Sequence, residues 1–354
     1  MPPRDPSVVS EQLDIAQESL KESPEIPMND DGDPQRCRPW RERSSSIKPI
    51  YTQKELLSYA KCFISEDDTL AMHTPMITKA IQLIRSVPSA IIRYGILFPI
   101  RLASLSAATI AFFVSLPVAV GLESNSMVAT LVKWYCKGIL FSLGTVPRYI
   151  GEKPWLSEPH VFVANHTSYL DYIVASAHQY PHAVVMARHK GALGFLQNNG
   201  LNFLHSMTFD RANLYERKNL AESLRKHVSN PITWPNPMLI FPEGTCVNNK
   251  YTIRFQKGAF ELGVKVCPIG IKYDRYWGDP YWDTRKGFLN YAFYRMTRWF
   301  TPVDIVFCTP QAPYDHEDPV MFGDRVKALI SDTIGLENVD FNGMAKRDLL
   351  KVIN

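Results

Sequence analysis

The chain has 354 residues, of which 45% are hydrophobic, and its formal net charge is +4. This length and apolar content suffice for one large domain with extensions or for two smaller domains. The slight basic excess fits an anionic membrane surface or a phosphorylated substrate. It excludes a typical nucleic-acid-binding protein, whose basic residues would cluster on one face.

The six cysteines are scattered, without a Cys-x-x-Cys pair, which is typical of reduced thiols in a protein that faces the cytosol. They also lack the spacing of a metal centre. His178 and His182 lie four residues apart, but Pro181 interrupts the helix that a metal site on them would need. We therefore expect no metal and no cofactor. The N-terminus has no apolar segment of the signal-peptide type, so we expect no cleaved signal.

Residues 1–46 are rich in proline, serine and acidic residues. A segment of this composition buries too little apolar surface to offset its ordering entropy, so we expect a disordered N-terminal tail.

An uncharged run from Leu102 to Leu122 is long enough, at 1.5 Å per residue, to cross a hydrocarbon core of about 30 Å. Basic residues flank it on both sides, which fits a hairpin that dips in and returns to the same side. Pro99 and Pro117 favour broken or half-length helices. We expect a membrane-associated helical region over residues 47–150, with its apolar segment at about 94–122. Spanning and dipping both stay open, and a buried core helix is the alternative.

Short β-rich runs alternate with helical stretches over residues 151–354, the expected catalytic domain. The expected strands are His160–Ala164, Ala183–Ala187, Met207–Phe209, Pro237–Phe241, Val266–Ile271 and Val303–Cys308. The expected helices are Ser168–Ala177, Leu214–Val228, Gly258–Leu262 and Asp318–Asp332. Such alternation predicts an α/β domain with a largely parallel or mixed central sheet. The aromatic-rich residues 275–300 fit an interfacial helix or a core helix equally well.

The first expected strand leads directly into Asn165-His-Thr-Ser-Tyr-Leu-Asp171. Five positions along a helix turn by about 140°, so His166 and Asp171 cannot share a helical face. They can meet if His166 lies in the loop and Asp171 in the first turn of a helix capped by Ser168. His166 would then lie at the carboxyl end of a strand, where α/β sheets bind ligands.

A carboxylate bonded to one imidazole nitrogen fixes the tautomer and makes the other nitrogen more basic. That second nitrogen can take a proton from an alcohol as it attacks a thioester, which typically contributes ~10²–10⁴ in rate. The same spacing also fits a plain helix cap, in which Asp171 satisfies backbone N–H groups and His166 is incidental.

Two further motifs carry polar side chains directly after expected strands. Phe209-Asp-Arg211 ends in an arginine that can hold a phosphate bidentately, or can form a surface ion pair. Ile240-Phe-Pro-Glu-Gly-Thr-Cys246 is an apolar strand that ends in a turn. Its Gly244 permits close backbone approach, while Glu243 and Thr245 offer an acceptor and a donor to a polyol.

The last two motifs follow closely. Lys257 directly precedes the expected helix Gly258–Leu262, and a lysine beside a helix N-terminus favours phosphate. Val266–Lys272 is an apolar strand that suits either a pantetheine or acyl passage or ordinary core.

In this order and spacing, the motifs resemble the glycerolipid acyltransferase superfamily that carries the His-x-x-x-x-Asp motif. The resemblance covers about Phe162 to Lys272 and implies an acyltransferase-type α/β domain behind an N-terminal membrane segment. It implies that His166 is the general base and Asp171 its partner. It assigns the binding of the phosphorylated acceptor to Arg211, Glu243, Gly244 and Thr245.

Within the superfamily, the chain resembles the microsomal glycerol-3-phosphate acyltransferases. The similarity rests on Asn165-His-Thr-Ser, Phe241-Pro-Glu-Gly-Thr-Cys-Val-Asn248, Phe255-Gln-Lys-Gly, Ile271-Lys-Tyr-Asp274, Ile92–Arg101 and Phe341–Arg347. It implies acyl-CoA as co-substrate, the sn-1 hydroxyl of glycerol 3-phosphate as acceptor, and lysophosphatidic acid as a product for phospholipid and triacylglycerol synthesis. It also implies the endoplasmic reticulum membrane, with the active site facing the cytosol, and access to lipid droplets.

Two positions depart from the superfamily pattern. Cys246 stands where many relatives outside this branch carry an arginine, which shifts the expected phosphate contact to Lys257. Tyr169-Leu replaces Pro-Ile ahead of Asp171. An acyltransferase for lysophosphatidic acid or another lysophospholipid is the first alternative, and a non-catalytic membrane scaffold of the same fold is the second.

Overall fold

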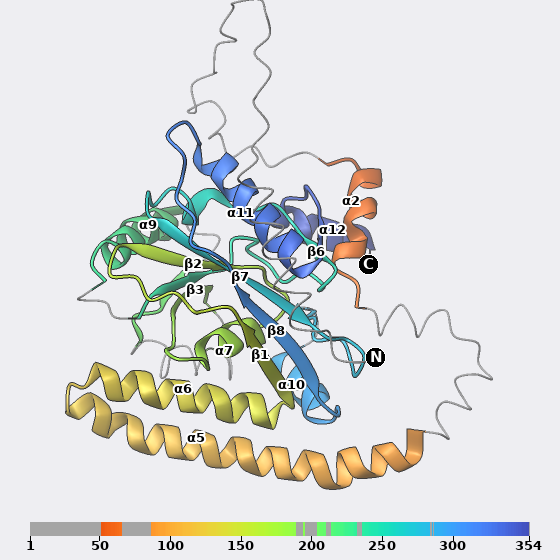
Figure 1. Cartoon of the computed structure of the whole chain (residues 1–354). Helices are drawn as coiled ribbons and strands as arrows, with labels where there is room; N and C mark the ends of the chain where they lie inside the picture. Colours follow the sequence, from red (N-terminus) through yellow and green to blue (C-terminus); the bar gives the residue numbers. More distant parts are fainter. Residues whose placement is uncertain are drawn as a thin grey trace, which may run out of the picture.

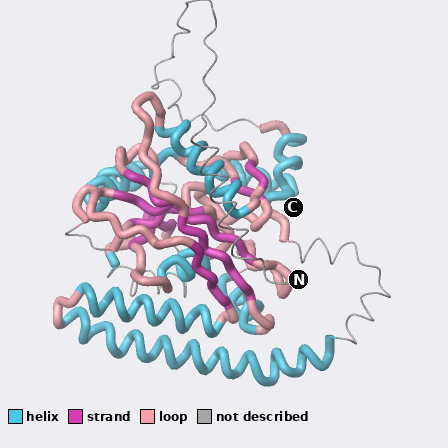
Figure 2. The backbone as a smooth tube through the Cα atoms, in the orientation of Figure 1, coloured by secondary structure: helices cyan, strands magenta, loops and turns pink. Residues whose placement is uncertain are grey.

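The protein is built around one seven-stranded sheet with helices on both faces (Figures 1 and 2). The computed structural model describes residues 51–65, 86–188, 194, 204–209, 214–231, 236–283, 285 and 287–353. The tail expected at residues 1–46 lies outside this range.

The central sheet has the strand order β1-β8-β7-β2-β5-β3-β4. Its strands are β1 (Thr145–Ile150), β2 (His160–Ala164), β3 (Ala183–Ala187), β4 (Met207–Phe209), β5 (Met238–Ile240), β7 (Lys265–Tyr273) and β8 (Thr301–Phe307). All neighbouring strands are parallel except β7 and β8, which are antiparallel. The prediction of a mixed α/β sheet is therefore confirmed. A separate two-stranded pair joins β6 (Tyr251–Thr252) to β9 (Glu337–Asn338).

Helices cover the sheet on both sides, which is why its central strands are continuous apolar runs. One face carries α5 (Phe98–Gly121), α6 (Asn125–Ser142), α7 (Leu170–Ser176) and α10 (Phe288–Met296), whose buried residues share one core with the sheet. The other face carries α9 (Leu214–Val228) and α11 (Pro319–Ile334) over a second core. All five residues of β2 are buried between the two cores.

A third, smaller core joins the two ends of the described chain. It holds α2 (Gln53–Tyr59) against α12 (Lys346–Ile353), and the fully buried Phe341 packs on the rings of Tyr59 and Phe63 from the N-terminal side. Residues that the sequence analysis placed in the membrane region therefore pack on the α/β domain. The predicted boundary at residue 150 is also wrong, because β1 pairs with β8 as an edge strand of the sheet.

The helices α5 and α6 run side by side as an antiparallel hairpin along one side of the molecule (Figure 1). They approach closely where Gly138 faces Ala108, since a β-carbon at Gly138 would lie only 2.8 Å from the Ala108 side chain. The predicted break at the prolines is wrong. Pro117 lies inside a continuous helix, and the irregularity is a π-helical turn at Arg93–Leu97, just before Pro99.

Two smaller corrections concern helices near the motifs. The expected helix Gly258–Leu262 is a single 3₁₀ turn at Lys257–Ala259, so no helix N-terminus stands behind Lys257. The aromatic stretch at residues 275–300 contains α10, in which Tyr291 is buried while Leu289 is 69% exposed. One side of α10 thus packs in the core, and its other side exposes apolar side chains.

Candidate active site

His166 and Asp171 meet at the carboxyl edge of the sheet, in the loop and first helical turn that follow β2. The Nδ1 atom of His166 lies 2.9 Å from Oδ2 of Asp171. Because β2 and β5 are parallel neighbours, the motif that follows β5 leaves the sheet at the same edge. The sheet therefore brings together two motifs that lie about eighty residues apart in the sequence, as Glu243 and His166 show.

The Asp171 carboxylate is fully buried and saturated with hydrogen-bond donors. Besides His166, its Oδ2 accepts the backbone N–H groups of Thr167 at 2.6 Å and Ser168 at 2.8 Å. Its Oδ1 accepts the hydroxyl of Tyr273 at 2.7 Å. These donors hold the carboxylate rigidly, so that it can orient the imidazole and stabilise its protonated form.

The helix begins later than the predicted cap at Ser168. Tyr169 already has helical dihedral angles and α7 starts at Leu170, so Asp171 does lie in the first turn. The Ser168 hydroxyl accepts the backbone N–H of Leu170 at 3.0 Å, and Tyr291 lies 3.1 Å from the same oxygen. The structure therefore combines a local cap and the His–Asp pair in one loop.

Glu243 holds the backbone of the loop that carries His166. Its Oε2 accepts the N–H of His166 at 2.7 Å, and its Oε1 accepts the N–H of Ile253 at 3.2 Å. Burial raises the pKa of this carboxyl to about 8, although the two N–H bonds act in the opposite direction. Sequence reasoning expected Glu243 to face the acceptor, whereas in the structure its carboxylate binds the backbone N–H of His166.

The turn after Glu243 is closed by the C-terminal tail. Gly244 has φ +67°, which glycine adopts without strain, and Thr245 is almost fully buried. The tail packs so tightly here that a β-carbon on Gly343 would lie 2.6 Å from the Glu243 carbonyl oxygen. Lys346, also buried, donates to the carbonyl of Cys246 at 2.9 Å. Gly343 and Lys346 therefore help to fix the turn Glu243–Cys246 that follows β5.

Cys246 is the neighbour of the second imidazole nitrogen. Its Sγ lies 3.4 Å from Nε2 of His166, and the ring of Phe241 stacks on the imidazole with centroids 4.4 Å apart. Burial lowers the pKa of His166, but the Cys246 sulfur and the Asp171 carboxylate outweigh it and raise the value to about 10. The arrangement is a thiol, an imidazole and a carboxylate in line.

Two buried asparagines, which the sequence analysis missed, tie the motifs to β7. Asn165 exchanges hydrogen bonds with the backbone of Ile271, at 2.8 and 2.9 Å. Asn249 donates to the Thr167 hydroxyl at 2.9 Å and accepts the N–H of Tyr273 at 2.7 Å. Both are positioning residues. Their roles depend on partners far away in the sequence, so local patterns give no signal for them.

The expected phosphate contacts are not all within this centre. Lys257 lies in an exposed turn and forms an ion pair with Glu261, with Nζ and Oε1 2.6 Å apart. Arg211 lies outside the described residues. The assignment of both to phosphate therefore stays a prediction.

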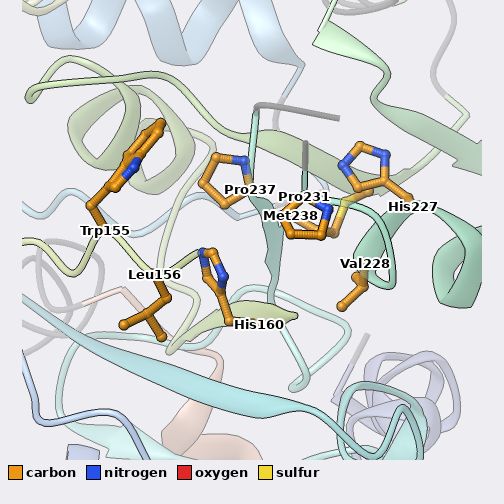
Figure 3. A pocket seen from close by; sticks show the side chains of 8 residues that line it. All are labelled: Trp155, Leu156, His160, His227, Val228, Pro231, Pro237 and Met238. Carbon is orange, nitrogen blue, oxygen red and sulfur yellow. The ribbon is translucent and has the colours of Figure 1, made fainter. Parts of the chain in front are cut away.

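A pocket lies at the opposite edge of the sheet (Figure 3). It is lined in part by Trp155, His160, His227 and Met238. His160 begins β2 and Met238 begins β5, whereas His166 follows the far end of β2. The pocket is therefore separate from the His–Asp pair.

Comparison with known proteins agrees with the motifs. Residues 145–272 match the family model described as Acyltransferase. Glycerol-3-phosphate acyltransferase 3 of Danio rerio is 33% identical over 73% of this chain and 58% of its own length. The protein of the same name from Xenopus laevis is 32% identical over 73% of the chain and 59% of its own. Glycerol-3-phosphate acyltransferase 4 of Mus musculus is 33% identical over 74% and 58%.

The chain thus spans less than two thirds of the length of these relatives. The matched residues contain β1, β2 and β5, the His166–Asp171 pair and the motif that follows β5. Over residues 145–272 this chain is therefore similar to the acyltransferase family, and the similar region includes the His166–Asp171 pair.

Proposed function

We propose that this protein is an acyl-CoA-dependent O-acyltransferase that acylates the sn-1 hydroxyl of glycerol 3-phosphate to give lysophosphatidic acid. The observation that carries the proposal is the 2.9 Å contact between His166 and a fully buried, rigidly held Asp171. The names of the relatives support glycerol 3-phosphate as the acceptor.

The chemical role of His166 depends on which of its two ring nitrogens is already hydrogen-bonded to Asp171. Asp171 Oδ2 accepts a hydrogen bond from Nδ1–H of His166, so Nε2 is the nitrogen that can accept a proton. The acceptor hydroxyl must reach this atom, lose its proton to it, and attack the thioester carbonyl. The proton then passes to the sulfur of CoA as the thioester bond breaks. Glu243 keeps the loop still by holding the N–H of His166.

The acceptor contacts are proposed from the same edge of the sheet. Gly244 and Thr245 form the turn next to His166, and we assign them to the glycerol part of the acceptor. Lys257 can bind the phosphate if it exchanges its exposed partner Glu261 for the substrate, at small cost for a surface ion pair. We also assign Arg211 to the phosphate.

An acceptor panel tests the assignment. Purified protein in liposomes is offered labelled palmitoyl-CoA with glycerol 3-phosphate, lysophosphatidic acid or lysophosphatidylcholine. We expect lysophosphatidic acid to form from glycerol 3-phosphate at the highest kcat/KM. A higher value for a lysophospholipid would replace the acceptor assignment with the first alternative. No acyl transfer to any acceptor, by folded protein, would favour the non-catalytic scaffold.

We further propose that α5 lies in the membrane interface and does not cross the bilayer. Within the described residues, Ser86–Gly121 is the helical run long and apolar enough to span, and only 17% of its apolar window is buried. Ile110, Val114 and Val118 are each more than half exposed and, four residues apart, lie on one face. Since α6 packs on the catalytic domain and α5 along α6, a crossing α5 would draw that domain into the lipid.

Vesicle flotation tests this orientation. Glutamate at Ile110, Val114 and Val118 should release the protein from vesicles, because carboxylates on the apolar face of the helix would have to enter the acyl-chain boundary. Leu57→Glu is the matched control, since Leu57 is a half-exposed leucine on α2, away from the hairpin. Undiminished flotation of the triple variant would refute the interfacial helix.

We place the enzyme at the endoplasmic reticulum, with its active site facing the cytosol, where acyl-CoA is available. Protease added to intact microsomes should therefore cleave a tag placed near the active site. Protection of that tag from the protease would contradict this orientation.

A further inference from the structure

An exposed apolar surface lies beside α10, next to the N-terminal end of α5 (Figure 1). Large apolar side chains gathered in one place on a surface mark a site of interaction. We call this one the aromatic surface. It consists of Tyr94, Tyr276, Trp277, Leu289, Phe293 and Phe300, each at least 36% exposed.

The aromatic surface is continuous with the long helix of the hairpin. The ring of Phe293, on α10, has its centroid 5.0 Å from that of Phe98 and 6.3 Å from that of Tyr94. Nearby, Nε1 of Trp299 donates to Oγ of Ser89 at 3.1 Å. The helix that we place in the membrane interface therefore leads directly onto α10 and the residues that follow it.

The same surface extends to the loop after β7. The ring centroids of Trp277 and Phe300 lie 5.0 Å apart, and those of Tyr276 and Trp277 lie 4.8 Å apart. Three segments that are separate in the sequence thus contribute to one exposed area. Its tyrosines and tryptophan have an apolar body and a polar tip, which suits the boundary between headgroups and acyl chains.

Positive charge surrounds the aromatic surface. Arg298, just after α10, lies over the Tyr294 ring at 4.1 Å from its centroid, and Arg93 donates to the carbonyl of Thr297 at 3.0 Å. None of the ion pairs among the described residues involves either arginine. Asp274 is an exposed acid of the neighbouring loop, and its carboxylate accepts a backbone N–H at 2.9 Å. Arginines among exposed rings favour a membrane that carries anionic lipid.

Buried charge behind the aromatic surface points to the same partner. Arg295, on α10, is fully buried, and its three guanidinium nitrogens have no hydrogen-bond partner among the described residues. Arg101, also buried, donates to the carbonyl of Met296 at 2.9 Å. Positive charge taken out of water without a counter-charge is costly, and a nearby anion offsets part of that cost. Anionic headgroups at the aromatic surface would provide this compensation without entering the core.

We propose that the aromatic surface is a second membrane contact, which binds anionic phospholipid and brings the His166 edge of the sheet to the bilayer. The inference rests on the interfacial position proposed for α5, and it adds the α/β domain itself to the membrane contact.

The aromatic surface and the loop after β2 lie on opposite sides of α10. On the buried side of this helix, the hydroxyl of Tyr291 lies 3.1 Å from Oγ of Ser168. The loop that carries Trp277 also reaches the loop after β2, because the N–H of Trp282 donates to the carbonyl of Thr167 at 3.1 Å. A helix with its side chains is about 10 Å across, so the bilayer would lie about one helix diameter from that loop. The acyl chain would then stay in the lipid while its thioester reacts.

Quenching by lipid tests the second contact. Leu289→Cys and Met321→Cys, each in a Cys37→Ser background, are labelled with bimane; the cysteines of the described residues are buried and resist labelling. The labelled proteins are bound to vesicles of phosphatidylcholine and phosphatidylglycerol whose acyl chains are brominated. Met321 is the matched control, a 55% exposed residue of α11 on the other face of the sheet. We expect loss of bimane fluorescence at position 289 and none at position 321.

Vesicle affinity tests the headgroup preference. Each arginine near an anionic surface contributes about 1 kcal/mol, which corresponds to ~5-fold in affinity. Arg298→Gln should therefore bind anionic vesicles ~5-fold more weakly than the wild type and bind pure phosphatidylcholine vesicles equally well. Lys351→Gln is the control, since the Lys351 side chain is 72% exposed on α12, and it should bind like the wild type.

The outcomes separate this contact from the other proposals. Unquenched bimane at position 289, on protein that floats with the vesicles, overturns the second contact and leaves α5 as the membrane element. Equal quenching at positions 289 and 321 also overturns it, because the two faces of the sheet cannot rest on one bilayer. Equal affinity of Arg298→Gln and wild type for anionic vesicles overturns the role of anionic lipid. Quenching at position 289 alone, by protein that acylates no acceptor, supports the contact and removes the proposed acyltransferase function.

Discussion

Replacing Asp171 by asparagine removes a charge from the centre and leaves its shape. The carboxylate accepts from His166, Thr167 and Ser168 on Oδ2 and from the Tyr273 hydroxyl on Oδ1. In Asp171→Asn the amide oxygen can keep the three donors on the first side. The new amide nitrogen then faces Tyr273, whose hydroxyl can turn and accept. The fold and the tautomer of His166 should therefore survive, while the buried negative charge is lost.

The expected loss in rate follows from that charge. Unit charges about 4 Å apart interact by ~4 kcal/mol at an effective dielectric constant near 20. Because the imidazole becomes positively charged as it takes the proton, most of this stabilisation acts in the transition state. A loss of ~3–4 kcal/mol lowers kcat by ~10²–10³-fold, with little change in KM.

The assay is the initial rate of acyl transfer to glycerol 3-phosphate by purified variants with matched thermal unfolding midpoints. Tyr273→Phe is the control, since it removes the contact on Oδ1 but keeps the charge. Loss of the hydrogen bond from Tyr273 to the charged carboxylate should raise the activation free energy of Tyr273→Phe by ~1.5–3 kcal/mol at most. A kcat of Asp171→Asn within threefold of wild type, or below that of His166→Ala, would refute the electrostatic role of Asp171.

Four further outcomes are expected, two at Glu243, one at Asn249 and one at Gly138. In Glu243→Gln the amide NH₂ group must face the N–H of either His166 or Ile253, so one of these two hydrogen bonds is lost. The free energy of unfolding should fall by ~1–3 kcal/mol at neutral pH. The value of kcat should fall as well, because His166 is displaced. The raised pKa of Glu243 means that the folded state keeps a proton that the unfolded state releases. The free energy of unfolding of the wild type should therefore decline between about pH 5 and 8, and this decline should be weaker in Glu243→Gln. Equal slopes of stability against pH for the two proteins would contradict this. Asn249→Ala leaves buried donors and acceptors unpaired and should lower the free energy of unfolding by ~2–4 kcal/mol, whereas a drop below 0.5 kcal/mol would contradict its positioning role. Gly138→Leu should push α5 from α6 at Ala108 and lower the thermal midpoint in detergent, with near-normal kcat for the folded fraction; an unchanged midpoint would show that the helices do not meet there.

Local patterns predicted the elements whose apolar runs end sharply. The bounds of β2, β3, β4 and α9 agree with the expected ranges. The edge strand β1 was missed because Pro147 and Arg148 break its apolar pattern, which an edge position tolerates. The helix expected after Lys257 is only a 3₁₀ turn, since its sequence contains too few residues before Gly263, which has φ +70°.

The candidate site was predictable only where its partners are neighbours in sequence. His166 and Asp171 are five residues apart, and helical geometry with a cap sufficed to bring them together. Glu243 and Cys246 reach His166 from about eighty residues away, and no periodicity encodes which face of the turn they present. Sequence reasoning accordingly identified Glu243 but assigned it to the substrate, and treated Cys246 only as a missing arginine.

The central claim is that His166 drives transfer of an acyl group to glycerol 3-phosphate. The most direct measurement is the rate of labelled lysophosphatidic acid formation from palmitoyl-CoA and labelled glycerol 3-phosphate, for purified wild type and for folded His166→Ala in the same liposomes. The account predicts 1-acyl product from the wild type and a loss of ~10²–10⁴-fold in the variant, as for removal of a general base. Equal rates for the two proteins, or no product from the wild type, would contradict it.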